Sequence, residues 1–112
     1  MNADTDILER LGATLENRKR AAADSSYVAS LYARGVDAMA RKIGEEALET
    51  ILAAKGGERE QIVRETADLW FHTLVLLAHH DLSYRDVLGE LARREGMSGI
   101  EEKAARRPSS PS

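Results

Sequence analysis

Hydrophobic residues recur at the spacing of an α-helix along most of the chain. The pattern predicts a first helix that begins at Thr5 or Asp6, either of which is a good N-cap, and ends at about Arg20. A short second helix is predicted over residues 27–34, where Gly35 would end it. The beginning of the chain is therefore expected to be helical.

The third helix is predicted over residues 36–55, before a Gly-Gly pair. Its apolar face at 3.6 periodicity is formed by Val36, Met39, Ile43, Ala47, Ile51 and Ala54. A fourth helix over residues 58–80 is apolar nearly all round, which is typical of a helix that is buried on all sides. A fifth helix, capped by residues 81–83, is expected to continue to about Arg94 and to be closed by Gly96.

These elements predict an all-α fold, an antiparallel bundle of four to five helices, with a last helical turn over residues 100–106. A chain of 112 residues is short for surrounding the fourth helix completely. We therefore expect a partner copy to complete the bundle, in a homodimer or a larger homo-oligomer.

Length and composition limit the number of domains and the functions that fit the chain. The length suits one domain, predicted over residues 1–106. Both prolines fall in residues 107–112, which are predicted to form a disordered tail. A net charge of −3 argues against a nucleic-acid partner, and the absence of cysteine excludes disulfides and cysteine-bound zinc. The start lacks the features of an export signal, and the longest uncharged apolar run is about half of the ~20 residues that span a membrane. A cytoplasmic location is expected.

Acidic residues gather on the predicted third helix. Glu46 and Glu49 share a face at i and i+3, and Glu45 lies one turn before Glu49. At ~100° per residue, Glu46 is expected at the edge of the apolar stripe. Such like charges repel unless a cation holds them. The alternative interpretation is a solvated acidic face, offset by Arg41 and Lys42.

The fourth helix carries a second carboxylate pair, Glu65 and Asp68. Their stripe is otherwise apolar, so each carboxylate would lose hydration unless it were paired or bound to a metal. Pairing with Arg59 or Arg64 is the structural alternative. His72 follows one turn later, and by itself it is interpreted as a core histidine with a hydrogen bond rather than as a metal ligand.

Antiparallel packing of these two helices would bring four or five oxygen-bearing side chains together. An oxygen-only cluster suits Mg²⁺ or Mn²⁺ and disfavours zinc. A di-iron bundle would need Glu-x-x-His on two helices, whereas here the i+3 partners are Glu49 and Asp68. The sequence therefore favours magnesium.

The motif Glu46-x-x-Glu49, fifteen intervening residues, then Glu65-x-x-Asp68 resembles the signature of the all-α, MazG-type nucleoside triphosphate pyrophosphohydrolases. Four further segments resemble the phosphoribosyl-ATP pyrophosphatase family: SYVASLY at 26–32, KIGEEA at 42–47, E-x-x-D-L-x-x-H at 65–72 and GIEEKA-x-R at 99–106. The resemblance covers about residues 7–106.

This resemblance implies that water splits phosphoribosyl-ATP between its α and β phosphates, giving phosphoribosyl-AMP and pyrophosphate in the second step of histidine biosynthesis. It also implies that Mg²⁺ is held by Glu46, Glu49, Glu65 and Asp68. Glu45 would be either a further ligand or the base that takes the proton of the water, and the two roles stay open.

Cations must then hold the polyphosphate and the 5′-phosphate of the substrate. The first candidates are Lys42, Lys103 and Arg106. A looser candidate is the cluster at residues 18–20, and for every one of these cations a solvated charge is the alternative. Tyr27 could stack on a base or pack, and Tyr32 is interpreted as packing.

Two other functions remain possible from the residues alone. One is a house-cleaning pyrophosphohydrolase that acts on dCTP or damaged triphosphates, although the motif at residues 99–106 argues against it. The other is a non-catalytic helical dimerisation module whose acidic residues form a surface patch. Stabilisation by Mg²⁺ would separate an enzyme site from such a module.

Overall fold

The computed structural model describes residues 3–96, and these residues form five helices with no strand among them. The helices are α1 (Ala3–Arg18), α2 (Tyr27–Arg34), α3 (Val36–Gly56), α4 (Arg59–His79) and α5 (Tyr84–Arg94). The all-α prediction is confirmed, and the ends of the helices lie within a few residues of those predicted. The predicted turn at 100–106 and the predicted tail at 107–112 lie outside the described residues.

Local chemistry explains where these helices begin and end. The Ser26 hydroxyl accepts a hydrogen bond from the Ala29 amide at 3.1 Å and so caps α2. Gly57 ends α3 with a left-handed backbone at φ 78°, which a residue with a side chain adopts only at a cost. Ser83 and Asp86 form a capping box at the start of α5.

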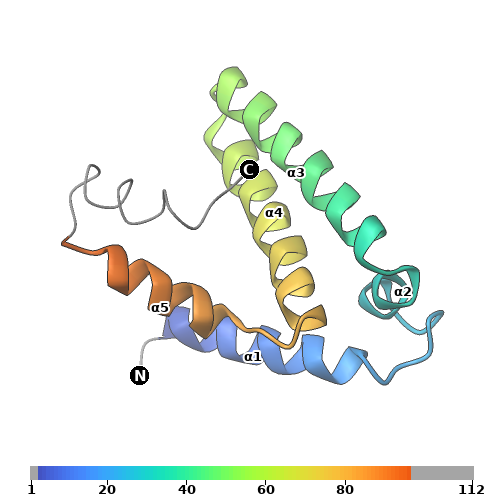
Figure 1. Cartoon of the computed structure of the whole chain (residues 1–112). Helices are drawn as coiled ribbons and strands as arrows, with labels where there is room; N and C mark the ends of the chain where they lie inside the picture. Colours follow the sequence, from blue (N-terminus) through green and yellow to red (C-terminus); the bar gives the residue numbers. More distant parts are fainter. Residues whose placement is uncertain (1–2, 97–112) are drawn as a thin grey trace, which may run out of the picture.

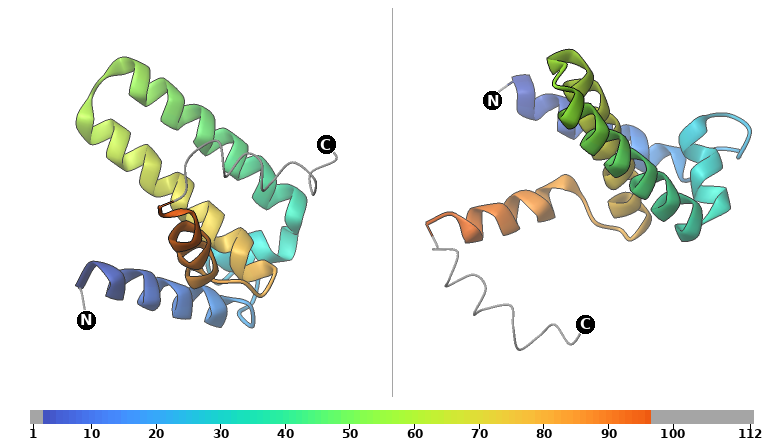
Figure 2. Two further views of the ribbon diagram at one scale, coloured as in Figure 1. Left: turned by 60° about the vertical axis from the view of Figure 1, so that its left-hand side comes forward. Right: turned by 90° about the horizontal axis from the view of Figure 1, so that it is seen from above.

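Helices α3 and α4 form a long antiparallel hairpin, and α1 lies across its open end (Figure 1). The short α2 packs against the beginning of α3, as the two further views confirm (Figure 2). The core lies where these four helices meet and contains Leu15, Val28, Leu31, Met39, Val75 and Ala78. The outer half of the hairpin, toward the turn at Gly57, extends beyond this core.

Helix α5 does not pack into the bundle as closely as the other helices. Tyr84 is its one buried residue, whereas Val87, Leu88 and Leu91 are exposed. These apolar side chains line a groove of about 420 Å³ between α5 and α4. Residues 3–96 therefore leave the apolar face of α5 incompletely covered.

One expectation about the packing of α3 is wrong. The buried residues of α3 are Met39, Glu46 and Ala53, spaced by seven, while Ile51 of the predicted apolar face is exposed. The reason is that α3 turns toward α4 the face that carries Glu46, so this residue lies inside the contact rather than at its edge. Helix α4 leaves Trp70 60% exposed, which agrees with the expectation that a chain of this length does not surround the helix completely.

The helices in residues 3–96 include none that combines the length and the apolarity needed to cross a membrane.

Candidate metal centre

Three glutamates from the two helices of the hairpin converge between α3 and α4. Glu46 and Glu49 lie on successive turns of α3 and Glu65 lies opposite them on α4, and one carboxylate oxygen from each falls within 4.8 Å of the others. Glu46 is only 7% exposed, Glu65 is half-buried and Glu49 is exposed. The cluster therefore leads from the helix interface to the surface.

Two carboxylate oxygens of this cluster are buried and, in the part of the chain that the structure describes, have no hydrogen-bond donor to replace the water that they lose. Within residues 3–96, no hydrogen-bond donor reaches Glu46 Oε2 or Glu65 Oε1. A buried carboxylate oxygen without a partner costs on the order of several kcal/mol. Oxygens held at this spacing suit a divalent cation such as Mg²⁺, which prefers carboxylate ligands. The donor set fits the metal that the sequence predicts.

The second oxygen of Glu65 is held by the protein itself. The Gln61 side-chain amide donates to Glu65 Oε2, and Arg64 donates to Gln61 Oε1 at 3.3 Å. Arg64 is thus linked to Glu65 through Gln61, in place of the direct ion pair that was the alternative interpretation. This arrangement orients the carboxylate of Glu65, while its Oε1 has no hydrogen-bond partner in residues 3–96.

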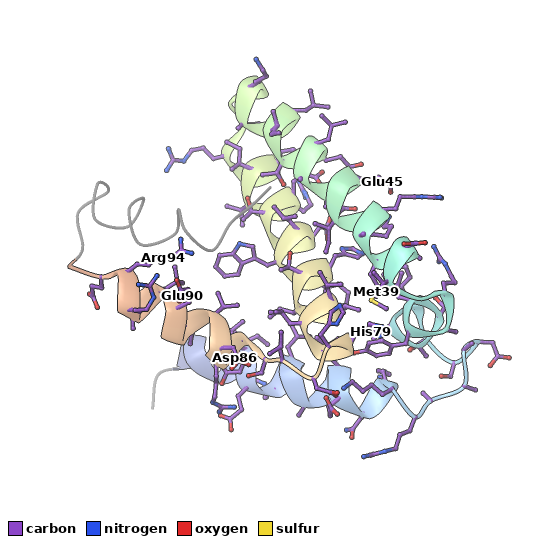
Figure 3. The ribbon with its side chains drawn as sticks, in the orientation of Figure 1. Met39, Glu45, His79, Asp86, Glu90 and Arg94 are labelled. Carbon is purple, nitrogen blue, oxygen red and sulfur yellow. The ribbon has the colours of Figure 1, made fainter. Side chains whose placement is uncertain are left out.

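Lys42 is the cation beside the cluster. Its ammonium lies 3.3 Å from Glu45 Oε1 and 3.7 Å from Glu46 Oε1. Hydrogen bonding to Glu45 is the main cause that raises the pKa of Lys42, and the nearby Tyr27 adds to it. Glu45 itself is exposed and stands outside the group of three, on the helix that also carries Met39 (Figure 3). Lys42 therefore stays charged at the mouth of the site.

Asp68 occupies a different position from the other predicted ligands. It is exposed, and the group of three converging carboxylates does not include it. It lines the rim of a groove between α1 and α4 whose other walls are apolar, among them Leu8, Trp70 and Phe71. The sequence analysis expected both carboxylates of this stripe to lose hydration, and this is wrong for Asp68, because its side chain remains exposed whereas that of Glu65 is half-buried.

His72 is fully engaged by hydrogen bonds. Its Nδ1 lies 2.8 Å from the Asp68 carbonyl oxygen, and its Nε2 lies 2.7 Å from the Tyr27 hydroxyl. The side chain is buried. This is the core histidine with a hydrogen bond that was favoured over a metal ligand.

Comparison with known proteins decides the family. The model of the family described as phosphoribosyl-ATP pyrophosphohydrolase matches residues 8–95, most of the chain and all of α2 to α5. The chain belongs to this family.

Named members of the phosphoribosyl-ATP pyrophosphohydrolase family are similar over almost their full length. A phosphoribosyl-ATP pyrophosphatase from Methylococcus capsulatus is 61% identical over 91% of this chain and 97% of its own length. The protein of the same name from Azoarcus sp. is 57% identical, over 93% of this chain and 97% of its own. The prediction of a pyrophosphohydrolase is thereby confirmed, rather than that of a non-catalytic module.

The other cations and tyrosines that the sequence analysis named as possible substrate contacts differ in their structural roles. Lys103 and Arg106 lie outside the described residues. Lys19 forms ion pairs with Glu16 at 3.1 Å and Asp81 at 2.9 Å, so it links α1 to the loop after α4. Tyr32 packs, as interpreted: its ring stacks on His79 and its hydroxyl donates to the Leu15 carbonyl.

Two features of this family member were missed by sequence reasoning. Gln61 precedes Glu65 by four residues, and this i, i+4 spacing is a signal that could have identified the contact. The bond between Tyr27 and His72 joins residues 45 positions apart. No local pattern reports such a pair, because it forms only when α2 and α4 are brought together.

Proposed function

We propose that the chain hydrolyses phosphoribosyl-ATP between its α and β phosphates and releases phosphoribosyl-AMP and pyrophosphate, the second step of histidine biosynthesis. The observation that carries this proposal is the pair of buried, unpartnered oxygens of Glu46 and Glu65 in a member of the phosphoribosyl-ATP pyrophosphohydrolase family. The highly charged substrate would be retained inside the cell, which supports a cytoplasmic location.

We propose Mg²⁺ as the cofactor, held by Glu46, Glu49 and Glu65. When bound, Mg²⁺ would neutralise negative charge on the phosphates and lower the pKa of a bound water. Asp68, which follows Glu65 by one turn, is proposed as a fourth ligand that completes the set from the exposed side. The burial gradient supports this order, because a cation held by the inner carboxylates would remain open to phosphate oxygens on the exposed side.

The remaining charged groups of the site would act on the substrate directly. The ammonium of Lys42 lies 3.7 Å from Glu46 Oε1 and would bind a phosphate oxygen of the substrate. Glu45 lies outside the group of three and is exposed, so we assign it the role of the base that takes a proton from the attacking water. Its contact with Lys42 would orient the carboxylate for this step.

We propose that the enzyme works as a homo-oligomer, most simply a symmetric dimer. The hairpin exposes large apolar side chains on both helices: Leu48, Ile51, Leu52, Val63 and Trp70. A further apolar groove of about 740 Å³ lies between α1 and α4. Apolar surface of this extent is rare on a monomer, and a second copy would present the same faces to it.

The test of the activity is pyrophosphate release from phosphoribosyl-ATP, measured beside ATP and dCTP with and without Mg²⁺. The proposal expects release that depends on Mg²⁺ and a kcat/KM for phosphoribosyl-ATP at least ~10²-fold above the others. Equal rates on all three nucleotides would favour a house-cleaning enzyme instead. A lack of release from each of them would contradict the proposal.

A further inference from the structure

Three polar side chains in the first two turns of α4 form a hydrogen-bonded chain that ends on the candidate metal centre. The Gln61 amide nitrogen donates to Glu65 Oε2, and the Arg64 guanidinium donates to Gln61 Oε1 at 3.3 Å. The three residues stand at i, i+3 and i+4, so the helix itself keeps them on one face. Gln61 and Glu65 are half-buried, whereas Arg64 is exposed. The chain therefore runs from the surface to the carboxylate cluster.

The chemistry of its two neighbours fixes the orientation of the Gln61 amide. A carboxylate only accepts hydrogen bonds, and a guanidinium only donates them. The amide nitrogen must therefore face Glu65 and the amide oxygen must face Arg64. The reverse orientation would set two acceptors against each other at one end of the amide and two donors at the other. Arg64 thus holds Gln61 in the orientation in which it donates to Glu65.

The hydrogen bond from Gln61 makes the two oxygens of Glu65 different. Oε2 accepts from the amide, whereas Oε1 is buried and has no hydrogen-bond partner in residues 3–96. One oxygen of Glu65 also lies within 4.8 Å of oxygens of Glu46 and Glu49. A glutamate side chain is long and flexible, and a hydrogen bond at one oxygen limits the positions that the other can take. Oε1 is therefore the oxygen of Glu65 that is available to a cation.

We propose that Gln61 and Arg64 are positioning residues of the magnesium site: Gln61 holds the carboxylate of Glu65 in the orientation that binds the cation, and Arg64 holds Gln61. The inference rests on the proposed function, from which it takes Mg²⁺ as the cation, and deepens it. Hydrogen-bonded partners commonly orient the ligands of metal ions in proteins, and their loss lowers metal affinity by about 10–100-fold. Neither residue needs to touch the metal or the substrate.

Gln61→Met tests the hydrogen bond to Glu65. Methionine keeps the length and the helix propensity of glutamine but donates no hydrogen bond, and the net charge does not change. We expect the Kd for Mg²⁺, measured by calorimetry on the metal-free protein, to rise about tenfold. Gln61→Asn, whose shorter amide does not reach Glu65, should give a similar loss. A Kd within about twofold of wild type in both variants would overturn the inference.

Arg64→Met gives the sharper test, because positioning and simple electrostatics predict opposite signs. A cation near a metal site repels Mg²⁺, so the loss of a bystander arginine should tighten metal binding. If Arg64 holds the amide of Gln61, its loss should instead weaken Mg²⁺ binding about threefold, since the amide can then turn away from Glu65. Unchanged or tighter binding in this variant would overturn the role assigned to Arg64.

Arg59→Met is the matched control for the change of charge. Arg59 is exposed on the first turn of the same helix and lines the same shallow depression as Arg64. Its replacement should leave the Kd for Mg²⁺ unchanged or slightly lower. Adding Arg64→Met to Gln61→Met should cause no further weakening, because the residue that Arg64 holds is gone. Additive losses in the double variant would contradict an action through Gln61.

Stability and turnover separate a positioning role from a structural one. A merely structural contribution would lower the Tm of the metal-free variants without changing their Kd for Mg²⁺, and that outcome would overturn the inference. We expect Gln61→Met to need about tenfold more Mg²⁺ for half-maximal pyrophosphate release, while kcat at saturating Mg²⁺ changes by less than about threefold.

The Kd series also distinguishes this inference from the proposed function, because it needs no substrate. If the wild-type protein binds Mg²⁺ but does not cleave phosphoribosyl-ATP, the proposed function fails, and the effects of Gln61→Met and Arg64→Met on Kd still decide the inference. If the wild-type protein cleaves phosphoribosyl-ATP and both variants keep its Kd for Mg²⁺, the inference fails alone. A wild-type protein that binds no Mg²⁺ would overturn the inference itself.

Discussion

Glu46 on α3 and Glu65 on α4 each bury a carboxylate oxygen to which no donor in residues 3–96 is directed, and oxygens of the two side chains lie within 4.8 Å of each other. Two like charges at this distance destabilise the hairpin unless a cation lies between them. We therefore expect the folded protein to be less stable without the cation than with it.

Stabilisation by Mg²⁺ is the first prediction. At a concentration of about 100 Kd, a ligand that binds only the folded state adds ~2.7 kcal/mol, which raises Tm by roughly 10 °C in a domain of this size. Glu46→Gln should abolish most of this gain and should raise Tm in the absence of metal, because it removes a repelling charge. Glu60→Gln, an exposed position on the same α4 helix as Glu65, is the control and should keep the full gain.

Turnover should depend on every member of the carboxylate cluster. We expect alanine at Glu46, Glu49 or Glu65 to lower kcat by at least ~10²-fold while helicity measured by circular dichroism is retained. Near-normal turnover in two of these three variants would contradict the metal site.

Asp68 should behave differently, because its side chain is exposed and stands outside the converging group. Asp68→Asn is expected to lower kcat while most of the Tm gain with Mg²⁺ is retained, since the inner carboxylates still hold the cation. Complete loss of the Tm gain would place Asp68 among the inner ligands instead.

The apolar surface of the hairpin should hold the oligomer together. Trp70 is 60% exposed in the single chain, and Trp70→Glu would place a charge in the proposed interface. Sedimentation should show the wild-type protein as a dimer or larger and the variant as a species near 12.3 kDa. Thr14→Glu, an exposed position on α1, should leave the assembly intact. A wild-type monomer with native helicity would refute the interface.

A pH dependence is expected from Glu90 on α5. Hydrogen bonds from Arg93 and then Arg94 lower the pKa of Glu90 to about 2, and Figure 3 shows Glu90 and Arg94 on this helix. Because the pKa is lower in the folded state, the contribution to stability is complete above the unfolded value of 4.5 and is lost as the pH falls toward 2. Wild type should therefore exceed Glu90→Gln in Tm at pH 7, and the difference should vanish near pH 2. A difference that stays constant with pH would contradict the ion pairs.

Lys103 and Arg106 are predicted to recognise the 5′-phosphate that ordinary nucleoside triphosphates lack. The combined change of both residues to alanine should raise KM for phosphoribosyl-ATP at least ~10-fold more than KM for ATP or dCTP. Stabilisation by Mg²⁺ should be unchanged, because the carboxylates belong to α3 and α4. Equal losses on all substrates would show that these cations do not select the second phosphate.

Features that depend on neighbouring residues could be predicted from the sequence. The cap at Ser26, the left-handed Gly57 and the start of α5 at Ser83 are set by contacts within a few residues, so the limits of the helices followed directly. The same holds for Glu46 and Glu49, because residues three apart share a helix face whatever surrounds them. The family resemblance rested on this local information, and the family match confirmed it.

Features that depend on how the helices face one another were decided only by the tertiary structure. Rotation of α3 toward α4 buried Glu46 inside the contact and left Ile51 exposed, although the periodicity placed Glu46 at the edge of the apolar stripe and Ile51 within it. Glu65 and Asp68 are one turn apart, yet only Glu65 joins the cluster, and Tyr27 meets His72 across 45 positions of sequence. The physical reason is that periodicity defines which residues share a face, whereas packing between helices selects which face is buried.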